Sequence, residues 1–344
     1  MIKLGLRSIL ALALGVAWIG KASAQTDAIA DFYRGKTVTL MVGGSAGGGY
    51  DILSRALAKY LGKHIPGEPS IVVKNMPGAG TILLTNYMNS VAPKDGTYIA
   101  SVANNAPFEP LYGTKEAQYD ATKLVWLGSP SSEVSLLTIW KNSPADSIAD
   151  ARVHELTMGS SGANSTPSFY AHVLNAVLGL KLKLVVGYPG QNDALLAMER
   201  GEIDGYPSAF YNSLMSSRPT WIKDKQVKLL VQYGAEKEPA LPDVPFAPDL
   251  ITNAADKQLM EEASAPLALG RPYLMPPGVP ADRVEAMRKA FFDTLKDPDF
   301  QADNQKLQLG ANAPRTGQQL QDTIVHAYQA PPDVIDRLKK LLAE

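Results

Sequence analysis

The sequence predicts an α/β protein made of two similar halves with a binding cleft between them. Short apolar runs alternate with helical periodicity along the chain, which indicates helices layered over sheets. A strand–helix–strand pattern occurs in each half, and each half has a loop of small residues directly before a helix. The chain of 344 residues is long enough for two domains.

The first half is predicted to begin with a strand over 38–42, followed by a glycine-rich loop and an amphipathic helix that ends at Gly62. Strands over 70–73 and 98–102, with a helix over 81–91 between them, complete a β-α-β-α-β unit. Ligands bind such sheets beyond the carboxyl ends of the strands. The apolar stripe of the first helix consists of Leu53, Ala56, Leu57, Tyr60 and Leu61.

The second half repeats this pattern. Thr166 is predicted to cap a helix that has Pro167 at its first position, and a second helix ends at Gly201. We assign residues 25–130 plus 234–344 to domain 1 and residues 131–233 to domain 2, with the last of the strands returning the chain to domain 1. The expected strands cover 134–140, 156–158, 182–186, 202–206 and 227–232, and helices over 282–296, 317–328 and 333–342 follow.

The N-terminus predicts export. Lys3 and Arg7 precede an apolar stretch from Ser8 to Gly20, and Ala22-Ser23-Ala24 forms a cleavage site, so residues 1–24 are expected to be a signal peptide cut after Ala24. An uncleaved anchor is the alternative, but the stretch is short for a bilayer. The chain has no cysteine, which excludes a lipoprotein anchor, a disulfide framework and a thiolate metal site. We expect a soluble periplasmic protein.

Composition narrows the class of partner. The predicted signal peptide holds three basic residues and no acidic one, so the mature chain has 30 basic against 34 acidic residues. This mild acidity disfavours nucleic acid and anionic membranes as partners. The four histidines, at 64, 154, 172 and 326, show no ligand spacing. We expect neither a metal nor a cofactor.

The glycine-rich loop predicts a backbone anion site. Five of the seven residues from Gly43 to Gly49 are glycine, and a helix N-terminus follows. The loop lacks the Lys-Ser/Thr pair of a phosphate loop, and no Lys or Arg lies between Thr37 and Ser54, so a carboxylate would be held by neutral donors. The alternative is a tight turn with Asp51 as a helix cap. The candidate ligand contacts here are Ser45, Ala46, Gly47, Gly48, Gly49 and Tyr50.

Further candidates follow other strands. Gly78 lies in a turn, and amide side chains follow the third strand, where they can hydrogen-bond a carboxylate or simply form a turn. In the second half, small polar residues precede a helix, where capping accounts for one or two of them. The candidates from these loops are Asn104, Asn105, Ser161, Asn164 and Ser165.

Together these segments resemble a known family. In order along nearly the whole mature chain, they are similar to the Bug or TctC-like solute-binding proteins, the extracytoplasmic receptors of tripartite tricarboxylate transporters. The segments are GGSAGGGYDILSRALAKYL, VVKNMPGAGTILLTNYMNSVAPKDGTY, GSSGANSTPSFYAHVLNAVLG, GYPGQNDALLAMERGEIDG, LPDVPFAPDL and YLMPPGVPADRVEAMRKAF.

The resemblance implies a two-domain fold of the type II periplasmic-binding-protein kind, with a hinge and an interdomain cleft. It implies a monomer that captures an organic carboxylate and delivers it to membrane permease subunits, and it places Asp204 near the pocket. The chain departs from the family pattern at Ala46 and Tyr50, where Pro and Thr are common, and at Tyr188, which opens a Tyr-Pro-Gly motif without the usual Lys. We therefore expect Tyr188 and Tyr50 to add aromatic surface, and the ligand to be aromatic or larger than citrate.

Two other functions compete. A binding protein that reports to a sensor kinase would use the same ligand chemistry as a transport receptor. An exported hydrolase would need a nucleophile with a base, such as Ser45 or Ser161 with His172, but nothing in the sequence pairs them. No catalytic residue is therefore assigned.

Overall fold

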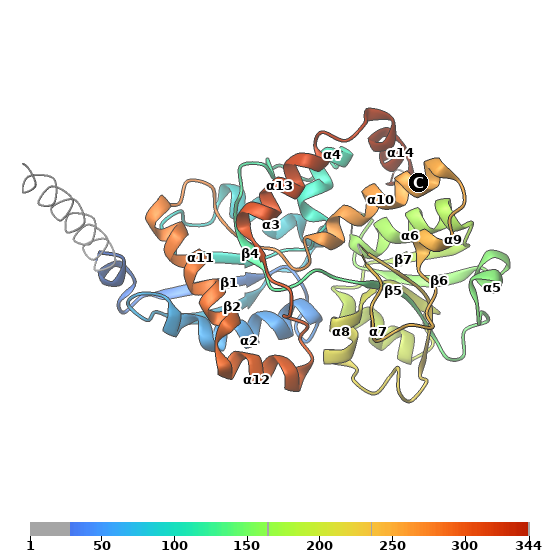
Figure 1. Ribbon diagram of the computed structural model, residues 1–344, viewed down its shortest axis with the longest axis horizontal. Coiled ribbons are helices and arrows are strands. Elements are labelled where there is room, and N and C mark those ends of the chain that lie inside the picture. Colours follow the sequence, from blue (N-terminus) through green and yellow to red (C-terminus); the bar gives the residue numbers. More distant parts are fainter. Residues whose placement is uncertain (1–27, 164, 235, 343–344) are drawn as a thin grey trace, which may run out of the picture.

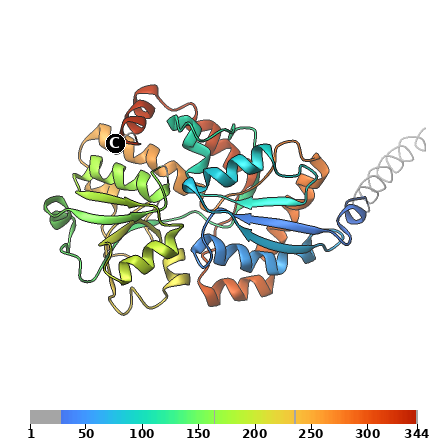
Figure 2. The ribbon, with the colours of Figure 1, turned by 180° about the vertical axis from the view of Figure 1, so that it is seen from behind.

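The computed structural model describes residues 28–342 except 164 and 235. It consists of two lobes, each built on one sheet with helices on both faces (Figures 1 and 2). The predicted two-domain α/β arrangement is confirmed. The predicted signal peptide lies outside the described residues, and among the described helices none is long and apolar enough to cross a membrane.

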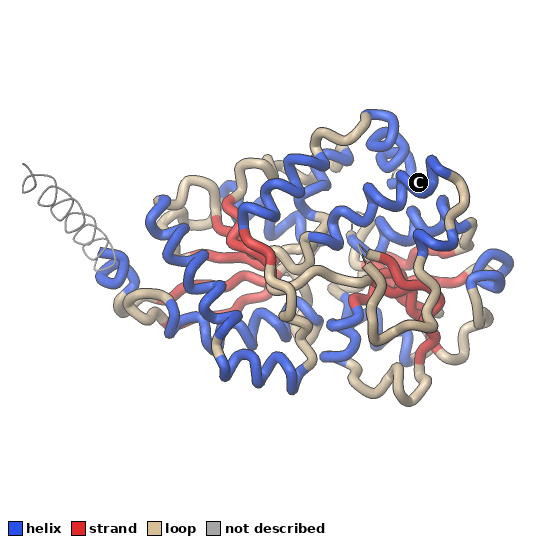
Figure 3. The backbone as a smooth tube through the Cα atoms, in the orientation of Figure 1, coloured by secondary structure: helices blue, strands red, loops and turns tan. Residues whose placement is uncertain are grey.

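The first lobe contains a six-stranded sheet in the order β11-β4-β10-β3-β1-β2 (Figure 3). Strand β1 lies inside the sheet, between β3 and β2, and its sequence TVTLMV is buried from the second residue onward. It pairs in parallel with β2 and β3, whereas β10 runs antiparallel to β3 and β4. The strands are β1 (Thr37–Val42), β2 (Ser70–Asn75), β3 (Tyr98–Ser101), β4 (Val125–Ser129), β10 (Tyr273–Met275) and β11 (Arg315–Thr316).

Helices cover both faces of this sheet (Figure 1). The predicted stripe of α2 is confirmed, since all five of its apolar residues are buried. The helix does not end at Gly62 but continues to His64. Gly62 is needed for close packing instead, because an added Cβ would lie 2.6 Å from the Pro69 carbonyl oxygen. The helices of this lobe are α2 (Gly49–His64), α3 (Ile82–Ser90), α4 (Glu109–Tyr112), α11 (Ala281–Lys296), α12 (Pro298–Leu307) and α13 (Gly317–Ala327), with short 3₁₀ turns η1 (Ala79–Thr81) and η2 (Ala106–Phe108).

The second lobe contains a five-stranded sheet in the order β7-β6-β8-β5-β9. Strands β6, β7 and β8 are parallel, and β5 runs antiparallel to β8 and β9. The strand predicted over 202–206 instead begins at Gly205 and extends to Phe210, so Pro207 lies inside it. The strands are β5 (Ser135–Trp140), β6 (Leu156–Ser160), β7 (Leu182–Val186), β8 (Gly205–Phe210) and β9 (Val227–Tyr233).

The helices of the second lobe again flank the sheet, with α6 against β8 and α7 against β6. The cap of α6 is Ser165, one residue earlier than predicted, so Thr166 and Pro167 form its first turn. The helices are α5 (Ile148–Val153), α6 (Thr166–Leu178), α7 (Gln191–Glu199), α8 (Tyr211–Ser217), α9 (Ala247–Leu250), α10 (Ala254–Ala268) and α14 (Pro332–Leu342).

The chain crosses between the sheets twice. The first crossing, 130–134, joins β4 to β5. The second follows α10. Strand β9 belongs to the second sheet, α9 and α10 then pack against β9 and α6, and the chain returns to the first sheet only at β10. The terminal helix α14 contacts both α4 and α6, so it bridges the lobes.

An apolar core also spans the lobes on the side of α4 and α6. The ring of Tyr112 in the first lobe stacks on that of Phe169 in the second, with centroids 5.4 Å apart. Phe169 contacts Tyr170, which in turn lies 4.7 Å from Tyr233. This continuous packing ties the lobes together on one side.

Candidate functional site

A cavity of about 80 Å³ lies between the lobes, beyond the carboxyl ends of β1, β3, β6 and β8. Both lobes contribute to its wall. None of the described residues that line it has a charged side chain. The lining residues are Gly43, Gly44, Tyr50, Gly78, Gly80, Thr81 and Ala103 from the first lobe and Ser161, Ser165, Thr166, Pro167, Pro189, Gly190, Gln191, Tyr206, Ser208 and Phe210 from the second.

Four helices direct their N-termini at this cavity. Residues from the first turns or caps of α2, α3, α6 and α7 all line it. No side chain caps any of these four helices, whereas α10, α12 and α13 are capped by Asn253, Asp297 and Thr316. Helices α3 and α6 also have no acidic residue in their first turns. The first N–H of α3 is used by the preceding turn, but the aligned peptide dipoles of the four helices favour an anion in the cavity without a cation.

Three buried polar atoms near the cavity have no hydrogen-bond partner among the described residues. They are Oγ of Ser45, in the glycine-rich loop, Nδ2 of Asn104, after β3, and Nε2 of Gln191, at the start of α7. The Ser45 hydroxyl is packed against Gly190, where an added Cβ would be 2.3 Å away. Buried polar groups are normally paired, so Gln191, which lines the cavity, offers a free donor to a polar ligand atom or water.

Aromatic rings form another part of the wall. The rings of Tyr50 and Phe210 come from different lobes, and their centroids lie 6.2 Å apart. The Tyr50 hydroxyl accepts a hydrogen bond from the Asn104 N–H at 3.3 Å. Burial raises the pKa of Tyr50, so this phenol stays neutral at physiological pH. Tyr206 adds a third buried ring.

The predicted amides after β3 connect the lobes instead of lining the cavity. Asn104 and Asn105 are fully buried, and both accept from the Thr166 hydroxyl, at 3.2 Å and 2.6 Å. Asn105 donates in turn to the carboxyl group of Glu109 at 2.7 Å. Burial raises the pKa of Glu109 to about 7, although hydrogen bonds from Thr114 and Asn105 oppose the shift.

The glycines of the predicted anion loop have structural roles. The Gly47 N–H donates to the Asp51 carboxylate at 2.9 Å, and the Gly48 N–H donates to the Ser45 carbonyl oxygen, so neither amide is free for a ligand. Gly49 meets the other lobe, since an added Cβ would lie 1.9 Å from the Ser213 hydroxyl. The part of the loop that does line the cavity is its start, Gly43 and Gly44.

Asp51 serves as a local anchor for this loop. Burial would raise the pKa of its carboxyl group, but hydrogen bonds from Arg55, Gly47 and Asn75 outweigh that effect and lower the pKa. The ionised carboxylate therefore holds the loop against α2, but the cap of that helix is Gly48 and not Asp51 as predicted.

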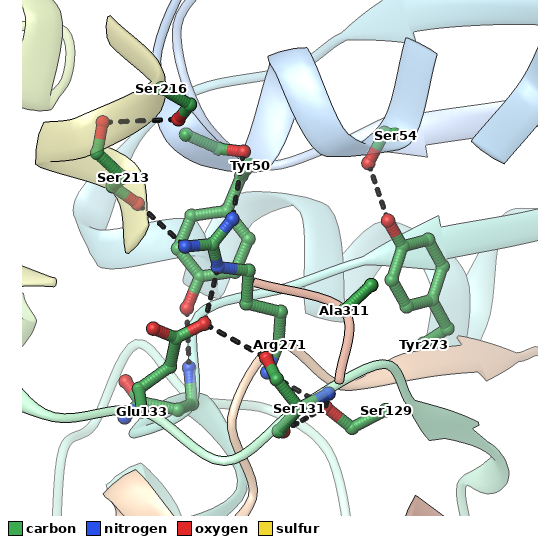
Figure 4. Close-up of polar contacts among 12 residues, drawn as sticks. Tyr50, Ser54, Ser129, Ser131, Glu133, Ser213, Ser216, Arg271, Tyr273 and Ala311 are labelled. Carbon is green, nitrogen blue, oxygen red and sulfur yellow. Dashed lines mark hydrogen bonds and ion pairs between the residues drawn. The ribbon is translucent and has the colours of Figure 1, made fainter. Parts of the chain in front are cut away.

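A buried ion pair lies where the chain crosses between the lobes (Figure 4). Arg271 Nε is 2.6 Å from the carboxylate of Glu133, and both side chains are fully buried. The guanidinium also donates to the Gly49 carbonyl oxygen at 3.2 Å and to the Ser213 hydroxyl at 2.9 Å. It lies 5.9 Å from the centre of the Tyr50 ring.

The remaining predicted residues divide into three groups. Tyr50, Gly78, Ser161 and Ser165 line the cavity, Ser45 lies beside it, and Ala46 is exposed. Tyr188 is next to the lining residue Pro189 but packs against the apolar cluster of the second lobe. Asn164 lies outside the described residues.

The structure corrects the expected position of Asp204 near the pocket. It precedes β8, whereas the cavity lies at the carboxyl end of that strand. Its carboxylate accepts from the N–H and hydroxyl of Thr157, at the start of β6, at 2.8 Å and 2.6 Å. It therefore joins two strand starts at the far edge of the sheet.

Several lining residues were missed by sequence reasoning. Thr81 and Gln191 carry no signal beyond a helix start, and the aromatic wall from β8 was hidden because that strand was placed too early. Within the described part of the chain, no group of acidic or histidine side chains could hold a metal ion.

Comparison with known proteins agrees with this architecture. The family model described as "Tripartite tricarboxylate transporter family receptor" (TctC) matches residues 53–338. A Cupriavidus necator protein named "UPF0065 protein in gbd 5'region" is 28% identical over 70% of this chain and 72% of its own length. A UPF0065 protein of Agrobacterium vitis is 26% identical over 85% of this chain and 78% of its own.

Solved structures share the fold. The periplasmic binding protein BugD matches with a TM-score of 0.71 at 20% identity, over 90% of this chain and 98% of that one. MatC from Rhodopseudomonas palustris with bound malate gives a TM-score of 0.68 at 20% identity, over 89% and 99%. An R. palustris protein with adipate gives 0.68 at 19% identity, over 90% and 97%. Because the family model covers most of the described residues, the chain belongs to the TctC family of solute-binding receptors.

Proposed function

We propose that this receptor captures an organic carboxylate in the cavity between its lobes and presents it to the permease subunits of a tripartite tricarboxylate transporter. The proposal includes action in the periplasm after removal of residues 1–24. The observation that carries it is the cavity itself, which has no charged lining residue yet receives four uncapped helix N-termini from both lobes. That arrangement favours an anion that must also be released.

The energetics are adequate for a transport receptor. A hydrogen bond to a charged group contributes about 1.5–3 kcal/mol net, and a helix dipole roughly 0.3–1 kcal/mol. Three such bonds near the upper value, with the dipoles of four helices, come to roughly 10–13 kcal/mol before the cost of ordering, which leaves room for a micromolar Kd of about −8 kcal/mol. Because the ligand would touch both lobes, it would bind the closed form better than an open one and shift the population toward closure.

The hydrolase alternative has little support. Ser161 lines the cavity, but His172, the base that it would need, lies on α6 and is not among the lining residues. The family match is also to receptors and not to enzymes. A role in reporting to a sensor kinase would use the same cavity, so it differs only in the partner.

Mass spectrometry of small molecules released from protein purified without denaturation tests the proposal. We expect one organic acid per chain, and uptake of that acid should stop when either the receptor or the permease is deleted. A bound neutral or cationic compound would contradict carboxylate capture. Normal uptake in the receptor deletion would favour the sensing role.

A further inference from the structure

We propose that the hydroxyl groups of Tyr50 and Tyr206, one from each lobe, donate hydrogen bonds to oxygen atoms of the captured acid. This inference rests on the proposed capture of a carboxylate and adds two side-chain donors to it. Both tyrosines line the interlobe cavity. In the described part of the chain, neither hydroxyl donates to an acceptor. An acid that accepts from both would be held by both lobes at once.

The Tyr50 ring is fixed by its neighbours while the proton of its hydroxyl stays available. The hydroxyl oxygen accepts from the Asn104 N–H at 3.3 Å, so one lone pair is used. The centroid of the ring lies 6.2 Å from that of Phe210, and the guanidinium of Arg271 is 5.9 Å from its centre (Figure 4). None of the described residues accepts the hydroxyl proton in return. Tyr50 is therefore a positioned donor whose acceptor a ligand can supply.

Tyr206 offers a second hydroxyl from the other lobe. It is the second residue of β8, and the alternate residues Tyr206, Ser208 and Phe210 of this strand all line the cavity. The residue is buried, and its hydroxyl forms no hydrogen bond with the described residues. A buried phenol usually finds a hydrogen-bond partner. The partner that Tyr206 lacks is therefore one that a ligand in the cavity can provide.

Both phenols donate as neutral groups. Burial raises the pKa of Tyr50 and that of Tyr206, and the charge of Arg271 opposes the shift at Tyr50 without overcoming it. A charge on Tyr50 would raise the pKa of Tyr206 further, so the two hydroxyls lie within electrostatic reach of each other. A neutral phenol can donate to a carboxylate, carbonyl or hydroxyl oxygen. The two donors therefore complement the helix dipoles, which favour an anion but do not fix the positions of its oxygen atoms.

The two donors belong to different sheets and their helices, which links them to closure. Tyr50 is the second residue of α2 in the first lobe, whereas Tyr206 belongs to β8 in the second. Movement of the lobes apart would separate the two hydroxyls, so one acid could accept from both only in the closed arrangement. The closed form would gain a contact that an open form lacks, which shifts the population toward closure. Removal of either hydroxyl should therefore weaken binding even though the ring stays in place.

Isothermal titration calorimetry on the ligand-free mature protein tests both donors. The probe is the tightest binder among malate, adipate, hexanoate, benzoate and the acid released on purification. We expect Tyr50→Phe and Tyr206→Phe each to weaken its binding roughly ten-fold or more, because only the donor is lost. Tyr170→Phe is the matched control, since the Tyr170 hydroxyl donates to the Ala263 carbonyl oxygen at 2.8 Å and this residue does not line the cavity. That variant should keep the wild-type affinity.

Urea unfolding without ligand separates a binding role from a structural one. Tyr206→Phe should unfold at the same urea concentration as wild type, because its hydroxyl has no partner among the described residues, whereas Tyr170→Phe should be less stable. Reduced stability of ligand-free Tyr206→Phe, or wild-type affinity in either Tyr50→Phe or Tyr206→Phe, would overturn this inference and leave carboxylate capture intact. If no acid is released on purification and none of the four named acids binds to wild type, both proposals fail.

Discussion

Arg271 and Glu133 lie 138 positions apart in the sequence but form a fully buried ion pair at 2.6 Å, each on a different one of the two segments that cross between the lobes. The pair therefore joins both crossing segments to each other. Through Gly49 and Ser213 the same guanidinium also contacts α2 of one lobe and α8 of the other (Figure 4). The contact between the lobes and the geometry of the crossing are thus connected at one side chain.

Removing one member of this pair should lower the free energy of unfolding more than removing both members together. Glu133→Leu leaves a buried guanidinium without its counter-charge, and we expect it to lower the free energy of unfolding by about 3–5 kcal/mol. The double variant Glu133→Leu/Arg271→Met should lose less than the sum of the losses in Glu133→Leu and Arg271→Met. Urea unfolding of the four proteins measures this, and strictly additive losses would show that the two charges do not interact.

Gly49 is predicted to control closure by its lack of a side chain. An added Cβ would lie 2.5 Å from Ser213 Cβ and 3.1 Å from its Cα, so α8 must move away from α2 in Gly49→Ala. We expect affinity for the acid released from the purified protein to fall at least ten-fold, while stability without ligand is kept, since alanine favours the helix. The control is Gly162→Ala, whose Cβ would meet only ordinary contacts with the other lobe, the nearest at 3.8 Å. Equal affinities for both variants would contradict a closed complex.

Glu109 should make stability depend on pH. Burial raises its pKa to about 7, so the folded state binds a proton more tightly than the unfolded state, whose pKa is near 4.3. The stabilisation is complete below about pH 4 and is lost as the pH rises through 7. Glu109→Gln should remove this loss, which amounts to about 2–3 kcal/mol. Urea unfolding from pH 5 to 8 measures it, with Glu116→Gln as the control for the nearby carboxylate. Parallel curves for Glu109→Gln and wild type would rule out this role.

Asp297 should show the opposite dependence. Hydrogen bonds from Lys63 and His64 hold the pKa of its carboxyl group below its ordinary range, although burial opposes them. Its stabilisation is therefore present above about pH 4 and is lost as the pH falls through the folded pKa. Asp297→Asn should be less stable than wild type at pH 7, and the difference should shrink toward pH 3. Exposed Asp299 supplies the control, Asp299→Asn. A difference that does not vary with pH would mean that only the cap of α12 matters.

The sequence predicted the elements with strong local periodicity and missed those set by distant contacts. The apolar stripe of α2 is buried as expected, because one helix face alone carries it. Strand β10 has three residues, and its pairing with β3 and β4 brings together segments about 150 residues apart, so no local pattern marks it. The buried ion pair of Arg271 was not predicted for the same reason, because this residue lies between α10 and β10 and pairs with a residue 138 positions away.

The candidate site was predicted in outline and differs in detail. The two facing small-residue loops do approach one another, but the amides of Gly47 and Gly48 are used within their own loop, which no residue pattern reveals. Pro207 disguised the extent of β8, since proline lacks the N–H that a strand interior needs. Because β8 was placed too early, the sequence did not predict that its aromatic residues line the cavity or that Asp204 lies outside it.

A crystal structure of the mature protein with the acid released on purification tests the central claim most directly. The account predicts a carboxylate in the interlobe cavity, held at helix N-termini from both lobes. An acid bound outside the interlobe cavity would contradict it.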